Sequence, residues 1–310
     1  MNQNKIRKFN KNNINKIVYR ILKIIFPVIL IFFLFKNSYI SLQQLELIFT
    51  ENKLNLFNNI LLSITLSLML YLRWMLCINI YDIKINFLSL IRVSSAAYSL
   101  ASFIPGQLGI DLLRIGKLRK SDSTKYKTKL LKATLIEKIF ALLGQLYILI
   151  SFLLKGLFFK IIFLILCILT INIFFNLTNN LKRKNYLKKY LKNINQKNIF
   201  INFFYSILCN YVSCYLIFNI AHSLKLNLPF NIVAISSTVS NISSVIPVSP
   251  NGLGLAEFIF SEVTQNISNL NNGESVATIY FSYRIFLLLS HFFIFYLSQS
   301  FIFKEKNINV

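Results

Sequence analysis

The sequence predicts an all-α polytopic membrane protein with about six transmembrane helices plus two re-entrant broken-helix segments, arranged as an inverted repeat. Of its 310 residues, 55% are hydrophobic, and the mean hydropathy is +0.58. Several apolar runs approach the roughly 20 residues that a helix needs to cross a bilayer. A second observation is a Pro- and Gly-containing motif that occurs twice, and a third is the concentration of Lys and Arg between the apolar runs.

The net charge of +24 also bears on the class of protein. The basic residues flank apolar runs, which is typical of membrane topology and of contact with anionic lipid. No basic module stands apart from the runs, so we expect no nucleic-acid partner. The four cysteines form no C-x-x-C pair and the two histidines have no ligand spacing around them, so we expect no metal site and no cofactor.

The N-terminal part of the chain predicts an anchor that starts on the cytoplasmic side. Residues 1–16 carry basic side chains and no acidic one, and we expect a mobile cytoplasmic tail. The first span is expected at about Ile17–Phe35 and the second at about Leu56–Ile80. Arg73-Trp74 lies near the inner end of the second span, where Arg and Trp are typical of the membrane interface.

The apolar, serine-rich segment 87–104 is expected to enter the membrane and return to the same side. The stretch 114–132 that follows contains eight basic residues and only Asp122 as an acidic one. Such a run belongs on the cytoplasmic side. A single crossing by residues 87–104 would place it outside, so we expect a re-entrant segment.

The rest of the chain repeats this plan. Further spans are expected at about Leu135–Leu154, Leu157–Phe175, Ile199–His222 and Val276–Phe301, with a basic cytoplasmic loop at 176–198. No Lys or Arg occurs between Lys225 and Arg284, so the second re-entrant segment, Phe230–Ile246, is expected to enter from outside. The prediction is one membrane domain, 1–310, with repeat halves at about 54–175 and 199–303, in the inner (cytoplasmic) membrane with both termini cytoplasmic.

Each re-entrant segment ends at one copy of the repeated motif. The first copy reads PGQLGID from Pro105, and the second reads PNGLGLAE from Pro250. Pro lacks an N–H and Gly is entropically costly in a helix, so both motifs predict a helix break. Inside a bilayer such a break is tolerated only where protein buries it or where it lines a watery cavity. The two breaks are therefore the candidate functional centre.

A helix that restarts after Gly109 or Gly254 would offer free N–H groups and a partial positive charge to an anion such as a lipid phosphate. Arg114 would add a bidentate contact, or would simply belong to the basic inner face. Asp111 and Glu257 would couple protons, or would cap the restarted helices. The candidate substrate-binding residues are Pro105, Gly106, Gly109, Asp111, Arg114, Pro250, Gly252, Gly254 and Glu257.

Two further charges are expected inside the membrane. Glu137 falls early in the third span and Arg284 falls about two turns into the last one. Charges at such depth are usually paired and functional. We therefore hypothesise an ion pair between Glu137 and Arg284.

With these residues in place, the chain resembles the membrane region of lysylphosphatidylglycerol synthase/flippase proteins and the stand-alone flippase-like proteins related to it. The resemblance rests on Arg73-Trp74, the stretch Ile104-Pro105-Gly106-x-x-Gly109-x-Asp111-x-x-Arg114, Glu137-Lys138, the stretch Pro247-x-Ser249-Pro250-x-Gly252-x-Gly254-x-x-Glu257, and Arg284. It covers nearly the whole chain. One departure is Gly109-Ile110-Asp111, where family members often carry Gly-Gly-Asp.

The resemblance implies a lipid flippase-like protein that translocates or binds an anionic phospholipid or a polyprenyl-phosphate-linked glycan in cell-envelope biogenesis. It also implies membrane lipids and envelope-biosynthesis proteins as partners. Fused members add a soluble aminoacyl-transferase domain that this sequence does not contain, so we expect no enzyme activity of that kind. The alternatives are an integral membrane transferase acting on a lipid-linked sugar, or a non-catalytic subunit of an envelope-assembly complex.

The inverted repeat makes a prediction about sidedness. In a variant with the four natural cysteines replaced by alanine, a single cysteine at Gln107 should react with a membrane-impermeant thiol reagent only from the cytoplasm. A single cysteine at Asn251 should react only from outside. Labelling of both from one face would contradict the inverted repeat and favour a one-sided enzyme or an assembly partner.

Overall fold

The structure is a computed structural model whose described residues are all helical or connecting, without a strand. It describes residues 32–33, 35–36, 40–50, 52–83, 85–101, 108–118, 124–154, 161, 165, 196–245, 252–268 and 276–308. The helices in order are α2 (Leu42–Thr50), α3 (Lys53–Asn79), α4 (Phe87–Ala101), α5 (Leu108–Lys117), α6 (Thr124–Leu153), α9 (Gln196–Ser223), α10 (Phe230–Ser243), α11 (Leu255–Ser268) and α12 (Ala277–Ile308).

Four of these helices are long and apolar enough to cross a membrane. Their spanning segments are Lys53–Asn79, Lys127–Leu153, Asn198–Ser223 and Ala277–Gln299. At about 1.5 Å per residue, even the shortest of the four helices exceeds the roughly 30 Å hydrocarbon core. Four of the six expected spans are thus confirmed. Of the expected spans 17–35 and 157–175 the structure describes only residues 32–33, 35, 161 and 165, and the tail 1–16 and most of the basic loop 176–198 lie outside the described residues.

One helix boundary differs from the sequence prediction. The third span was expected to begin at Leu135, but α6 begins at Thr124 and spans 30 residues. Lys127, Lys129 and Lys132 therefore lie on its N-terminal turns and not in a loop. Lys is a good helix former, and its long side chain can carry its charge to the membrane surface, so a basic run does not end a helix.

The two predicted breaks separate two pairs of short helices. α4 has 15 residues and α10 has 14, so each is roughly 22 Å long and too short to cross the hydrocarbon core alone. After each comes a gap in the described residues, 102–107 and 246–251, and then α5 or α11. Pro105, Gly106 and Pro250 fall in these gaps. We refer below to α4–α5 and α10–α11 as the broken-helix pairs.

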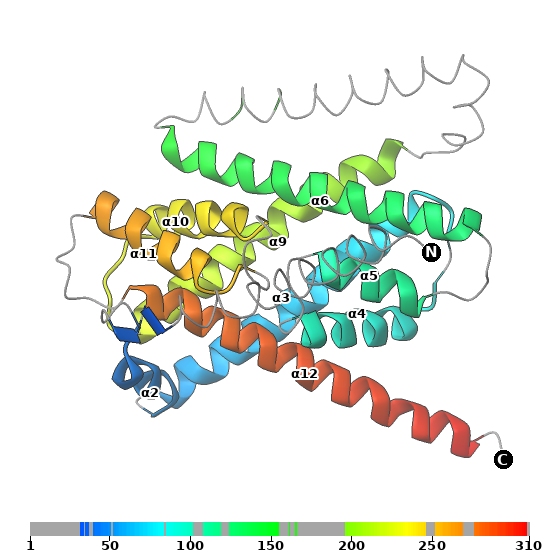
Figure 1. The fold of residues 1–310 in the computed structure, drawn as a ribbon, viewed down its shortest axis with the longest axis horizontal. Coiled ribbons are helices and arrows are strands. Elements are labelled where there is room, and N and C mark those ends of the chain that lie inside the picture. The colour runs from blue at the N-terminus through cyan, green and yellow to red at the C-terminus, as the bar shows by residue number, and fades with distance from the viewer. Residues whose placement is uncertain are drawn as a thin grey trace, which may run out of the picture.

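The two halves of the chain are arranged alike (Figure 1). α3 and α9 cross at the centre, and the two broken-helix pairs lie at opposite ends of the bundle along its long axis. α4 packs on α12 as α10 packs on α6, and α5 contacts α6 as α11 contacts α12. The contacts of the first half thus have counterparts in the second. Which broken-helix pair faces the cytoplasm and which faces the outside stays a prediction.

Serine allows the short helices to pack closely. Ser95 and Ser99 on α4, and Ser236 and Ser240 on α10, are buried. Two of these hydroxyls bond to their own helix: Ser99 Oγ donates to the Ser95 carbonyl (2.8 Å), and Ser240 Oγ donates to the Ser236 carbonyl (2.7 Å), whereas the buried Ser236 Oγ has no partner among the described residues. Small side chains with internally satisfied hydroxyls are typical of helix contacts inside membranes.

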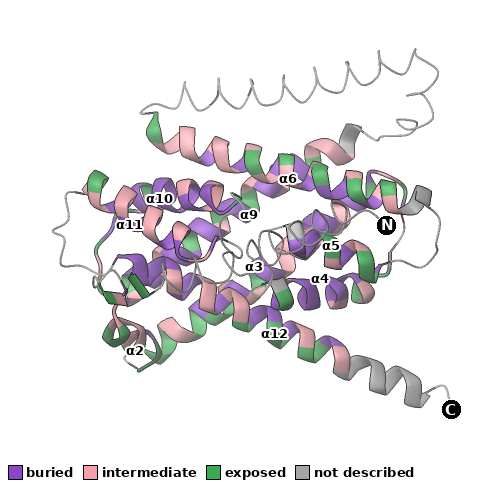
Figure 2. Cartoon of the chain, in the orientation of Figure 1, coloured by how far each residue is buried: buried purple, intermediate pink, exposed green. Residues whose placement is uncertain are grey.

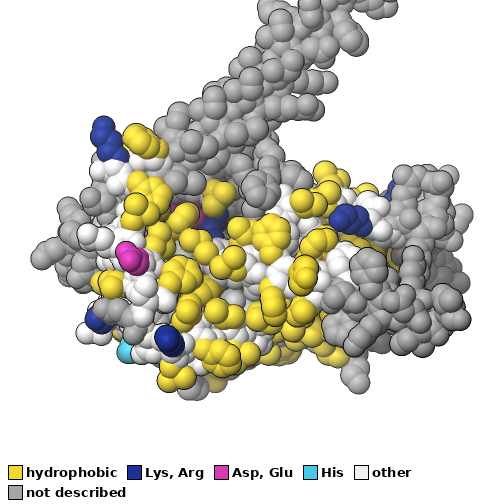
Figure 3. All heavy atoms as spheres, turned by 90° about the horizontal axis from the view of Figure 1, so that it is seen from below, with side chains coloured by type: hydrophobic (Ala, Val, Ile, Leu, Met, Phe, Trp, Pro, Cys, Tyr) yellow, Lys and Arg dark blue, Asp and Glu magenta, His cyan; other side chains and the backbone are white. Residues whose placement is uncertain are grey.

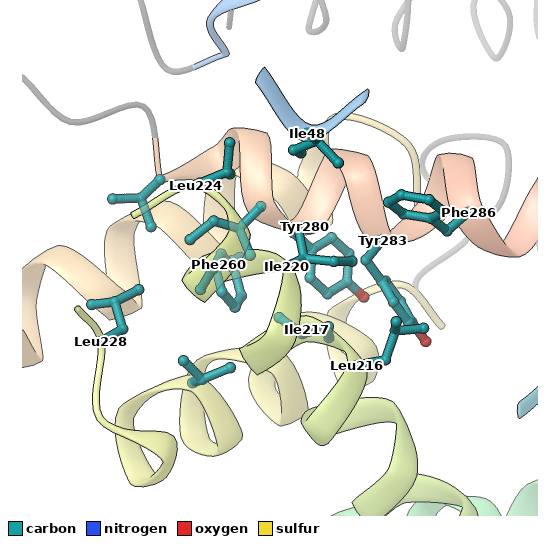
Figure 4. Packing of buried hydrophobic residues seen from close by; sticks show 14 of the residues in the cluster. Ile48, Leu216, Ile217, Ile220, Leu224, Leu228, Phe260, Tyr280, Tyr283 and Phe286 are labelled. Carbon is teal, nitrogen blue, oxygen red and sulfur yellow. The ribbon is translucent and has the colours of Figure 1, made fainter. Parts of the chain in front are cut away.

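Hydrophobic residues occur both in the core and on the surface of the described chain. Buried residues follow the inner faces of the helices (Figure 2), and one hydrophobic cluster joins α2, α9, α11 and α12 around Phe260 and Tyr280 (Figure 4). Hydrophobic side chains also dominate the described part of the face seen from below (Figure 3). On α9 the exposed Phe204, Leu208 and Tyr215 recur at helical spacing. Such an outward stripe is suited to lipid tails.

Gly252 allows the turn before α11 to pack directly against the end of α10. Its φ of +72° lies in the left-handed region, and a Cβ there would lie 2.6 Å from Ser244 Cβ and 2.7 Å from Ser244 Cα. Only glycine fits this approach without displacing backbone.

We expect Gly252→Ala to lower the free energy of unfolding by about 1–3 kcal/mol, because it adds both backbone strain and a clash. Thermal unfolding of the purified protein in detergent measures the effect. Gly116→Ala is the matched control, because a Cβ there meets nothing within 4 Å and the residue lies in a helix. The control should unfold at the same or a slightly higher temperature; an equal loss in both variants would contradict the role of Gly252.

Candidate functional site

The first broken-helix pair carries a network of buried charges, which we call the α5 cluster. It consists of Arg73 on α3, Asp111 and Arg114 on α5, and Glu137 and Lys138 on α6. Its ion pairs are Arg73 Nη2–Glu137 Oε1 (3.4 Å), Arg114 Nη1–Glu137 Oε2 (3.2 Å), Arg114 Nη2–Asp111 Oδ1 (2.7 Å) and Lys138 Nζ–Asp111 Oδ2 (3.6 Å). The two carboxylates thus link three helices.

Arg114 is the centre of this network. Its side chain is fully buried, and its two Nη atoms contact one carboxylate each. Its guanidinium also lies over the rings of Trp74 (4.6 Å to the ring centroid) and Tyr98 (5.2 Å). A planar guanidinium is suited to such combined pairing and stacking. The contacts fix Arg114 within the protein, so it holds the cluster together and does not face the cavity described below.

The second broken-helix pair carries a smaller set, the α11 cluster, made of Gly254, Glu257, Tyr280 and Arg284. Glu257 Oε1 forms an ion pair with Arg284 Nε at 3.1 Å, without hydrogen-bond geometry. The Gly254 N–H donates to Glu257 Oε2 at 2.7 Å. The Arg284 guanidinium lies over the Tyr280 ring (5.3 Å), and the Tyr280 hydroxyl donates to Asn241 Oδ1 at 2.8 Å. These contacts connect α10, α11 and α12.

The expected ion pair between Glu137 and Arg284 is wrong. Glu137 contacts Arg73 and Arg114, whereas Arg284 contacts Glu257. The reason is local, because the short helix after each break lies against the long helix that follows it in the chain. The carboxylate in the first turn of the short helix therefore meets the nearest basic side chain of that long helix. Depth in the membrane alone does not select the partner.

Sequence spacing holds a signal for the observed pairs. Lys138 follows Asp111 by 27 residues (138 − 111), and Arg284 follows Glu257 by the same 27 (284 − 257). The two pairs therefore have the same sequence separation in the two halves. Three residues after the carboxylate the halves differ: α5 has Arg114, whereas α11 has Phe260, which packs on Tyr280 with ring centroids 5.4 Å apart.

The sequence suggested that the N-termini of both α5 and α11 are free to bind an anion. The structure shows that the N-terminus of α11 is not free. Glu257 itself accepts from the Gly254 N–H and so takes the place expected for a substrate anion at α11. This is the capping role left open for Glu257, since a carboxylate in the first turn stabilises the N-terminus. Gly109 is buried at the start of α5, and Gly252 and Gly254 form the turn before α11 with φ of +72° and +83°.

A cavity of about 170 Å³ extends between the two clusters. Three basic side chains line it: Arg73 and Lys138 from the α5 cluster and Arg284 from the α11 cluster. No carboxylate is among its described lining residues. Its polar but uncharged lining residues are Tyr98, Gln145, Asn210, Ser213, Asn241, Ser244, Tyr280 and Tyr283. The arrangement is suited to a small anion, which three positive charges would attract and the polar groups would orient.

Sequence reasoning missed most of this lining. Arg73 was interpreted as an interface marker and Lys138 received no role, because a single basic residue near a span end is common. Asn210 and Asn241 lie within apolar helices, where polar side chains usually face protein, and this was a usable signal. Among the described residues no group of His, Cys, Asp and Glu could hold a metal ion.

A family model described as "Lysylphosphatidylglycerol synthase TM region" matches residues 20–294, which include both clusters and the cavity. The chain belongs to this family. The resemblance stated from the sequence is thereby confirmed, and this family member is a multi-pass membrane protein. No curated protein and no solved structure matches the chain significantly.

The observed pairing predicts which charges are energetically coupled. In a double-mutant cycle, Glu257→Gln and Arg284→Gln should show a coupling of about 1–3 kcal/mol in the free energy of unfolding, because each single change leaves a buried partner unpaired. The same cycle on Glu137→Gln and Arg284→Gln is the control and should be additive within about 0.5 kcal/mol. Coupling in the control cycle alone would contradict the pairing described here.

Proposed function

We propose that the protein binds and translocates an anionic lipid, either an anionic phospholipid or a polyprenyl-phosphate-linked glycan, in cell-envelope biogenesis. The observation that carries this proposal is the cavity between the two broken-helix pairs, lined by three basic and no acidic side chains of the described chain. Membership of a family of lipid-related membrane regions supports the same class of substrate.

The physical basis is the cost of moving a charged headgroup through hydrocarbon. A bare charge at the bilayer centre is costly, by several kcal/mol or more. Arg73, Lys138 and Arg284 would replace the water that an anionic headgroup loses on entering the membrane. The acyl chains would stay outside, against exposed apolar stripes such as that of Phe204 and Leu208 on α9.

The transferase alternative receives less support. General acid–base chemistry needs ionisable groups that act together on one substrate. Asp111 and Glu257 belong to separate clusters and each is engaged by basic side chains or backbone of its own cluster. We therefore propose a non-enzymatic role in the cytoplasmic membrane, with both termini cytoplasmic and with lipids and envelope-biosynthesis proteins as partners.

Translocation can be tested in vesicles that contain the purified protein and a trace of fluorescent phosphatidylglycerol. Dithionite destroys the fluorophore only in the outer leaflet, so the remaining signal reports lipid still inside. Wild-type protein should expose the inner pool far faster than protein-free vesicles do. Arg284→Gln should slow the exchange at least tenfold, because it removes one of the three charges of the cavity.

Lys117→Gln is the matched control, because Lys117 is an exposed basic residue at the end of α5 that does not line the cavity. It should exchange lipid at the wild-type rate. The same assay with a labelled polyprenyl phosphate decides between the two lipid classes. Wild-type vesicles that move neither lipid faster than empty vesicles would overturn the proposal and favour an assembly partner.

A further inference from the structure

Among the described residues, the two clusters contain one more basic side chain than acidic ones. Their basic members are Arg73, Arg114, Lys138 and Arg284, and their acidic members are Asp111, Glu137 and Glu257. An unbalanced charge inside a membrane domain is costly unless a ligand or water compensates it. One negative charge in the cavity would bring the set to neutrality.

Two of the basic side chains also have N–H groups left over. Among the described residues, neither Arg73 Nε nor Arg284 Nη1 has a hydrogen-bond partner, although both atoms are buried. The Arg73 side chain is only 9% exposed. Buried donors without acceptors are rare and unfavourable, so acceptor atoms are expected near both. Both residues line the cavity.

The equivalent basic residues of the two halves meet at this one cavity. Lys138 and Arg284 occupy matching positions, and each is held from outside the cavity by the carboxylate of its own half, Asp111 at 3.6 Å and Glu257 at 3.1 Å. Carboxylates in this position fix the basic groups before a ligand arrives. A ligand between them would therefore contact both halves of the repeat at once.

The size of the cavity limits what it can hold. At about 30 Å³ per water molecule, 170 Å³ corresponds to roughly five or six waters. A phosphate group, with five heavy atoms, fits this space. The cavity thus has room for the phosphate of a headgroup.

We propose that this cavity binds one singly charged phosphodiester group, held between Lys138 and Arg284 with Arg73 as the third contact. The inference rests on the proposed function and identifies the part of the lipid that the protein recognises. Four oxygen atoms on one phosphorus can accept from several of these donors at once, and a single negative charge matches the surplus of one. A phosphodiester binds here because it neutralises the site without adding a second charge.

Dimethyl phosphate is a direct probe, because it is a singly charged phosphodiester without acyl chains. Added to the purified full chain in a nonionic detergent, it should raise the thermal unfolding temperature in a saturable way beyond the effect of sodium chloride at equal ionic strength. Lys138→Gln and Arg284→Gln should each weaken the apparent affinity at least tenfold. Lys117→Gln should leave it unchanged, since Lys117 does not line the cavity.

A variant that keeps every charge tests the cavity even if the charge variants lose affinity only because they misfold. Ala141 lines the cavity on α6, and Ala141→Leu should fill part of it and abolish the dimethyl phosphate effect. Binding by Ala141→Leu with wild-type affinity would overturn the assignment to this cavity. So would the absence of any effect on wild type, or an equal loss in Lys117→Gln and Lys138→Gln.

Competition separates a lipid headgroup from free phosphate. Phosphatidylglycerol in mixed micelles should displace dimethyl phosphate, and inorganic phosphate should bind more weakly than the diester. Stronger binding of inorganic phosphate without competition by the lipid would overturn the phosphodiester assignment. If dimethyl phosphate binds but the vesicles move no lipid, translocation is overturned and the binding site stands. If lipid exchange survives both Lys138→Gln and Arg284→Gln, the binding site is overturned and translocation stands.

Discussion

The pairing of charges inside an apolar helix bundle is the constraint on which the rest of the structure depends. Arg114 is fully buried, so two carboxylates and two aromatic rings stabilise its charge in place of bulk water. Those partners come from α3, α4, α5 and α6, and their positions are set by this one side chain. Ion pairs and aromatic contacts together thus hold the broken helix against α3, α4 and α6.

Much of the fold could be predicted from hydropathy and helix breakers, and less of the site could. Runs of apolar residues located α3, α9 and α12 to within a few residues, because an uninterrupted span depends on local composition. The start of α6 was placed too late, since Lys does not end a helix. Partners such as Glu257 and Arg284 depend on which helices touch, and only the shared spacing of 27 residues pointed to them.

Beside the cavity, α6 of the first half packs closely against α9 of the second half. A Cβ at Gly144 on α6 would lie 2.8 Å from Asn210 Nδ2 on α9, and that same amide donates to the Ala141 carbonyl at 3.2 Å. Close helix approach at a small residue, with a polar side chain across it, is a common way to fix helices in membranes. α6 and α9 therefore form one closely packed wall of the cavity.

The exchange of Arg114 for Phe260 at matching positions makes the two ends of the molecule unequal barriers. Parting α5 from its neighbours would bring charged groups into contact with water, which solvates them and offsets the lost ion pairs. Parting α11 from α12 would expose Phe260 and Tyr280 to water, an unfavourable exposure, together with the one ion pair between Glu257 and Arg284. The α5 end is thus held together mainly by ion pairs and the α11 end by an aromatic contact beside a single ion pair, so water would stabilise the separated surfaces differently at the two ends.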